Sequence, residues 1–134
     1  MGNYTEFVFG AELKKDTPKE VIETLTWMIK GEDTYTPPDH PLFSTTRWES
    51  IGTGCSYSFG YVDPLSDIHV DDISGRHIFA IRCSIKNYED EIELFIDWIR
   101  PYIKRGSGEN DFLGYSIYEE AKKPTLYYLH EESP

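Results

Sequence analysis

Apolar and polar residues alternate in several stretches of the chain, and this period of two predicts β-strands. The first stretch is residues 4–13, which places four apolar residues on one side: Phe7, Phe9, Ala11 and Leu13. Further strands are expected over residues 56–62, 67–73, 76–86, 113–119 and 125–130. Ser74 and Gly75 form a plausible hairpin turn between two of them. Residues 76–86 are the best candidate for the central strand because their inner face is almost entirely apolar.

Two other segments carry apolar residues at helical spacing. The first helix is expected to begin at an N-cap, Thr17, with a proline after it, and to end at Gly31. The second is expected to run from the N-cap Asn87 to about Ile103. Its apolar stripe, which should face the sheet, is Ile92, Phe95, Ile96, Ile99 and Ile103.

The order of these elements is strand, helix, about three strands, helix and two strands. There is no repeated alternation of strand, helix and strand, so the pattern predicts an α+β fold. We expect a mainly antiparallel sheet of about five to six strands with two helices packed on one face. No repeat or linker divides residues 1–134, which indicates a single domain.

Residues 42–51 fit neither period, and we expect an irregular segment with a short strand. Trp98 lies on a flank of the second expected helix, beside its apolar stripe. It is therefore a candidate interface residue, although packing against residues 42–51 is the favoured interpretation.

The net charge of the chain excludes some classes of binding partner and favours others. Its 134 residues include 24 acidic and 13 basic side chains, for a net charge of −11. Such a charge repels nucleic-acid phosphates and anionic membranes, so we expect no non-specific nucleic-acid binding and no membrane association. The same charge favours encounter with a basic protein.

The compartment is predicted from cysteines and from apolar runs. Cys55 and Cys83 are the only cysteines, no signal peptide is recognisable, and no apolar run is long enough to span a bilayer. We therefore expect a cytoplasmic protein with reduced thiols.

Potential metal or acid-base groups concentrate around one short strand. Asp67, His69 and Asp71 would share a strand face and could converge on a cation. No second cluster of ligands accompanies them, so a solvated edge is the favoured interpretation and no metal is expected. His77 shares a face with apolar residues, and the glycines at 52–54 lack the remainder of a nucleotide-binding motif, so no cofactor is expected.

Aromatic residues supply the candidate binding surface. Tyr and Arg give binding surfaces a large contact area with a polar tip. We expect residues of this kind to gather on the sheet face opposite the helices: Tyr57, Phe59, Tyr61, Arg82, Tyr118 and Tyr128. They could bind a partner or ligand, pack under a second layer, or form a homodimer interface.

Three parts of the sequence carry a resemblance. They are the opening segment 6–22, Arg47-Trp48 followed by residues 56–59, and residues 124–128. Together they resemble small hypothetical proteins carried by bacteria and their phages or mobile elements. The resemblance implies an accessory binding role, such as an immunity or anti-defence factor, and brings no catalytic residue with it.

Three functional hypotheses remain open at this point, and one of them is a purely structural subunit with a large apolar self-interface. The leading one is a non-enzymatic protein-binding or accessory factor, with a homodimer as one possible assembly. The alternative is a small enzyme or ligand-binding domain, with a pocket that joins His69 or His77 to nearby carboxylates and tyrosines.

Overall fold

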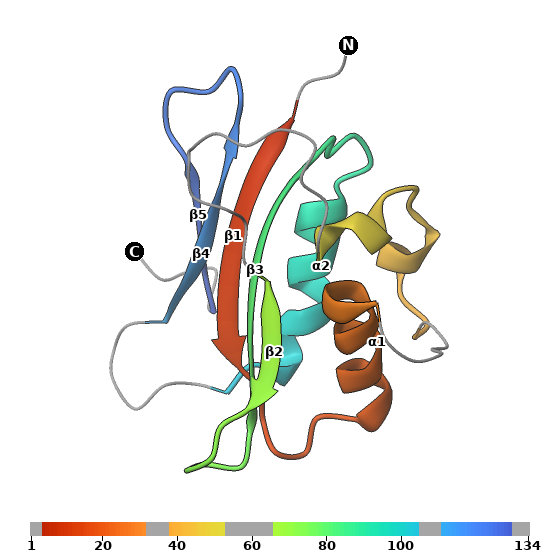
Figure 1. Cartoon of the computed structure of the whole chain (residues 1–134). Helices are drawn as coiled ribbons and strands as arrows, with labels where there is room; N and C mark the ends of the chain where they lie inside the picture. The colour runs from red at the N-terminus through yellow and green to blue at the C-terminus, as the bar shows by residue number, and fades with distance from the viewer. Residues whose placement is uncertain (1–3, 32–37, 53–65, 105–110, 130–134) are drawn as a thin grey trace.

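The computed structural model describes residues 4–31, 38–52, 66–104 and 111–129, and it has the predicted α+β architecture (Figure 1). All the strand pairs are antiparallel, and the sheet order is β2-β3-β1-β4-β5. The strands are β1 (Thr5–Glu12), β2 (Asp67–Val70), β3 (His77–Ile85), β4 (Phe112–Tyr118) and β5 (Thr125–Tyr128). The helices α1 (Lys19–Lys30) and α2 (Glu91–Ile99) cover one face of this sheet.

β1 is the middle strand of the sheet, which corrects the expectation that residues 76–86 would be central. Phe7 of β1 lies opposite Cys83 of β3 on one side and Ser116 of β4 on the other. β3 is an interior strand but lies next to the short edge strand β2. An apolar face shows that a strand is buried, but it does not show how many strands flank it.

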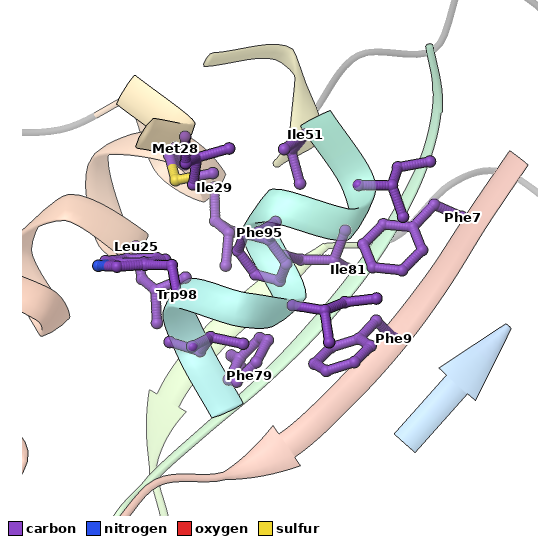
Figure 2. Packing of buried hydrophobic residues seen from close by; sticks show 14 of the residues in the cluster. Phe7, Phe9, Leu25, Met28, Ile29, Ile51, Phe79, Ile81, Phe95 and Trp98 are labelled. Carbon is purple, nitrogen blue, oxygen red and sulfur yellow. The ribbon is translucent and has the colours of Figure 1, made fainter. Parts of the chain in front are cut away.

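The core lies between the sheet and the two helices, and its centre is aromatic (Figure 2). Phe95 of α2 makes edge-to-face contacts with Phe7, Phe9 and Phe79, whose ring centroids lie 5.8–6.4 Å from its own. Such contacts add to the free energy gained by burying the rings. The whole predicted stripe of α2 is buried: Ile92, Phe95, Ile96, Ile99 and Ile103.

α1 ends where the sequence predicts but begins differently. Gly31 has a φ of 66° and donates its backbone N–H to Trp27 O, which is a left-handed helix stop. The N-cap position is occupied by Pro18 and makes no side-chain hydrogen bond. The expected N-cap, Thr17, instead donates its hydroxyl to Lys14 O and fixes the preceding turn.

α2 begins later and ends earlier than predicted. The backbone N-cap is Asp90, but Asn87 still accepts a hydrogen bond from Ile92 N at 2.8 Å through its side chain. Asn87 therefore caps the helix from outside it. The helix ends at Ile99 because Pro101 cannot continue the hydrogen-bond pattern, and the chain continues in a 3₁₀ turn, η3 (Arg100–Tyr102).

Residues 42–51 contain no strand, which corrects that expectation. They form parts of two 3₁₀ helices, η1 (Pro41–Ser44) and η2 (Trp48–Ile51), which pack against α2. Phe43 lies between Trp48 and Trp98, with ring centroids 4.8 and 5.1 Å away. The predicted contact between this segment and Trp98 is thus confirmed.

The remaining predicted strands divide into two groups. The pairs β2–β3 and β4–β5 are the expected hairpins, and Gly75 supplies a left-handed residue in the first turn. The strand expected over residues 56–62 lies outside the described residues. Within the part of the chain that is described, no helix has the length and apolar content needed to cross a bilayer.

Candidate functional site

The predicted binding residues that the structure describes do not form one surface. Tyr57, Phe59 and Tyr61 lie outside the described residues. Trp98 is buried by η1 and the core, so its side chain is not available on the surface of a single chain.

The other three predicted binding residues are separated by the sheet. Tyr118 lies opposite Thr5 and therefore on the face of Phe7, beneath the helices, which corrects its expected placement. Arg82 and Tyr128 lie on the opposite face, but β1 and β4 separate their strands by about 14 Å. The strand period was read correctly, but the register that selects the face was not available from the sequence.

Arg82 belongs to a compact polar cluster on the face of the sheet opposite the helices. Its guanidinium contacts the Glu6 carboxylate at 3.2 Å, and Ser84 lies opposite Glu6 on the neighbouring strand. Glu6 and Ser84 are both buried, and Arg82 Nε and Ser84 Oγ have no hydrogen-bond partner. The Glu6–Arg82 pair ties β1 to β3 and leaves two polar atoms unsatisfied.

The polar residues at 67–71 bond to one another, to α1 and to the following turn at the edge of the sheet. Asp67 accepts a hydrogen bond from His69 at 2.9 Å, and Lys30 of α1 lies 3.9 Å from the same carboxylate. Asp71 accepts Ser74 N in the hairpin turn, and the hydrogen bonds from Ser74 hold the pKa of Asp71 below its usual value. No group of three or more His, Cys, Asp or Glu side chains within the described ranges is arranged to hold a metal ion.

The two histidines of the alternative hypothesis lie on opposite faces of the sheet. His69 is opposite Ile78, whereas His77 is opposite Val70 and shares the helix-covered face with Phe79. One pocket cannot use both rings because the sheet stands between them.

Two hollows lie beside the β4–β5 hairpin, on the side of α2. The first, here called the hairpin-turn hollow, has a volume of about 280 Å³ between the start of α2 and the hairpin turn. Its lining is mainly polar or aromatic: Thr5, Asn87, Tyr88, Glu93, Ser116, Tyr118, Ala121, Lys123 and Thr125. The second, the β5-edge hollow, measures about 240 Å³ and is lined by Glu93, Ile96, Arg100, Leu126, Tyr127 and Tyr128.

Glu93 is shared by the two hollows and sets their electrostatics. Asn87 donates to Glu93 Oε1 at 2.8 Å, which fixes the carboxylate at the start of α2. Tyr127 shares a hydrogen bond of 2.7 Å with Ser116. Burial raises the pKa of the Tyr127 phenol, the Ser116 hydrogen bond lowers it, and the nearby negative charge of Glu93 raises it. Tyr127 is therefore held in its neutral form.

Comparisons with known proteins add no assignment to this geometry. No family model, curated protein or solved structure matches the chain. The hollows must therefore be interpreted from their own chemistry.

Each hollow combines the Glu93 carboxylate with hydroxyl groups and aromatic rings, and each also has one basic side chain in its lining, Lys123 in the hairpin-turn hollow and Arg100 in the β5-edge hollow. The carboxylate and the rings suit a Lys or Arg side chain, since a cation is attracted both by a carboxylate and by the face of an aromatic ring, whereas the basic residues of the lining oppose it. Of the residues that line them, the sequence indicated Tyr118 and Tyr128 but not Glu93 or Tyr127. In the sequence Glu93 is one of four carboxylates that closely follow Asn87, a position that is favourable for the helix dipole alone and so does not mark a site.

Proposed function

We propose that this chain is a non-enzymatic binding protein that works in the cytoplasm and engages a basic partner protein through the hairpin-turn hollow. Its role would be that of an accessory factor of the immunity or anti-defence type, as the sequence resemblance implies. The observation that carries the proposal is the position of Glu93 in a hollow lined by tyrosines and hydroxyls.

The surface around this hollow supports contact with a protein. Tyr88 and Tyr118, at its rim, are exposed by 59% and 40%, and each offers an aromatic ring with a polar tip. Tyrosine is enriched in binding surfaces because it buries a large area and loses little conformational entropy, since its side chain has few rotatable bonds.

Charge supports a basic partner. The net charge of −11 attracts cationic proteins over long range, and Glu93 offers a fixed local contact. Lys123 opposes this attraction because it lines the same hollow. Its removal is therefore a direct test of the sign of the partner's charge.

Site-specific photo-crosslinking tests the proposal. A photoreactive phenylalanine analogue at position 118 should give a discrete adduct with one protein in cells that carry the gene. Lys123→Glu should increase the yield of this adduct, because it removes a repulsive charge and adds an attractive one.

Two controls make the result specific. The same analogue at Ile73, which is 97% exposed in the remote β2–β3 turn, should give no such adduct. Lys15→Glu makes the same change of charge at an exposed site before α1 and should leave the yield unchanged. Equal labelling from positions 73 and 118, or a lower yield with Lys123→Glu, would count against a basic partner in this hollow.

A further inference from the structure

The two edges of the sheet differ in how they are protected. β2 carries Asp67 and His69, and Lys30 of α1 reaches the Asp67 carboxylate. Charged side chains of this kind discourage another strand from pairing with an exposed edge. β5 is equally short, but its sequence Thr-Leu-Tyr-Tyr contains no charged residue. The chemistry of the strands, not their length, distinguishes the two edges.

Exposed apolar side chains gather at the β5 edge. Leu126 is 51% exposed and Phe112, on the adjoining strand, is 43% exposed. Tyr128 packs edge-to-face on Phe112 with ring centroids 5.5 Å apart. The β5-edge hollow lies on the α2 side of the same strand, with Ile96 in its lining. Exposed apolar surface is therefore available beside β5 on the face opposite the helices, at Leu126 and Phe112.

From these features we infer that β5 is a self-association edge, along which a second copy of this chain pairs its own β5 in the antiparallel direction. Such pairing is related by a two-fold axis and joins the two sheets into one. A two-fold interface stops assembly at two copies, because each copy uses its β5 edge and no unpaired β5 remains.

Charge identifies a second copy as the occupant. The hairpin from Phe112 to Tyr128 contains two acidic residues, Glu119 and Glu120, and two basic residues, Lys122 and Lys123. It is therefore neutral, although the whole chain carries −11. Two strongly acidic molecules repel each other least where their surfaces are locally neutral, as this hairpin is.

One contact within the chain limits the length of the pairing. Arg100 donates from Nη2 to Tyr128 O at 2.9 Å, so the acceptor at the end of β5 is already in use. Among the described residues, the part of this edge that has no partner strand and no acceptor already in use is thus centred on Leu126. Paired copies would place their Leu126 side chains close to the two-fold axis, with Phe112 and Tyr128 beside them.

This assembly is independent of the proposed function. The partner site uses the hairpin-turn hollow, whereas the dimer uses the β5 edge and Leu126. Substitution of Leu126 tests the dimer, and crosslinking at position 118 tests the partner, so either inference can fail without the other.

Light scattering over a concentration series is the test. The unmodified chain should approach twice its mass of 15.6 kDa as concentration rises. Leu126→Lys should raise the dissociation constant by roughly 100-fold, because the substituted side chain occurs twice in a symmetric interface. Ile73→Lys is the matched control, since it adds the same charge at an exposed apolar site away from β5 and should leave the dimer intact.

Amide hydrogen exchange then distinguishes strand pairing from stacking of the faces. Exchange within Thr125–Tyr128 should slow as the dimer forms. A chain that stays monomeric at every concentration, a dimer that tolerates Leu126→Lys, or a dimer without protection in β5 would each overturn the inference. Circular dichroism must show both variants folded, and Leu126→Glu provides a second disruptive change if Leu126→Lys does not fold.

Discussion

Glu91 is a carboxylate that the fold has fully enclosed at the start of α2. Its Oε1 accepts Glu89 N at 3.0 Å, and its Oε2 accepts Arg47 N at 3.2 Å, with the Arg47 guanidinium 3.8 Å away. Arg47 also lies 3.8 Å from the Glu89 carboxylate and above the ring of Tyr88. The Glu91 side chain therefore joins α2 to Arg47, the residue that precedes η2. The segment that carries Phe43 and Trp48 is held against α2 in part by this contact.

Replacing Glu91 by Ala should lower the free energy of unfolding by about 2–4 kcal/mol, because two backbone N–H groups and Arg47 lose their buried acceptor. Urea denaturation followed by tryptophan fluorescence would measure the change. Glu23→Ala makes the same substitution on the exposed side of α1 and should change stability by less than about 0.5 kcal/mol. Equal effects of the two changes would show that Glu91 has no special role.

The pKa of the Tyr127 phenol depends on Glu93, the carboxylate that lines both hollows. Burial raises the pKa of its phenol most, and Glu93 raises it further, so Glu93→Gln should lower this pKa. Ser116→Ala should raise it, because the Ser116 hydrogen bond lowers the pKa. NMR titration of the Tyr127 ring at alkaline pH would measure both shifts, and shifts in the same direction would contradict the geometry.

The sign of the associated stability follows from that raised pKa. The folded state favours the neutral phenol more than the unfolded chain does. The stabilisation is therefore complete below the unfolded pKa and is lost as pH rises through the folded pKa.

At the scale of elements, the pairing of β1 with β4 depends on a missing side chain. A Cβ atom on Gly114 would collide with the backbone of Val8 and Phe9. Gly114→Ala should therefore destabilise the fold by about 3 kcal/mol or more, since rigid backbone must move. Gly31→Ala is the comparison: φ there is 66° but the space is open, so only about 1 kcal/mol is expected. Thermal denaturation of both variants would establish the order, and the reverse order would refute it.

The elements were predictable where local chemistry determines them. Gly31, the alternation in β1 and the stripe on α2 each act within a few residues, and each was located correctly. The beginnings of the two helices were displaced because the side chains of Thr17 and Asn87 bond to other backbone groups than the expected ones. Residues 42–51 do not show their structure in a local pattern, because the aromatic contacts described for Phe43 and Trp48 are with Trp27, with Trp98 or with each other.

The candidate site was less predictable than the elements that support it. Tyr118 was recognised as a binding residue but was assigned to the wrong face, because a strand pattern defines two faces without saying which one the helices cover. Glu93 of α2 lines one hollow with Ser116 of β4, and its charge raises the pKa of Tyr127 of β5, so the site combines three elements. No spacing in the sequence encodes a contact of that kind.

At the scale of the whole molecule, charge opposes the compact state. With a net charge of −11, folding brings like-charged side chains closer together and so increases their repulsion, which salt screens. Raising NaCl from about 0.01 to 0.15 M at neutral pH should therefore raise the Tm by roughly 2–5 °C. Calorimetry near the pI of about 4.7 is the control, because there the repulsion disappears and so should the gain. A Tm that falls with salt at neutral pH would show that attractive ion pairs dominate instead.

The middle position of β1 has a consequence for the order in which the molecule is made. β1 leaves the ribosome before β3 and β4, the two strands that it needs as neighbours, and β4 ends only at Tyr118. Pairing between segments so far apart in sequence is slow and leaves strand edges exposed in the meantime. A nascent chain interrupted after β3 would hold β1 with one side unpaired along Thr5–Phe9, where β4 belongs. Completed translation, rather than local folding, is thus what protects the centre of this sheet from aggregation.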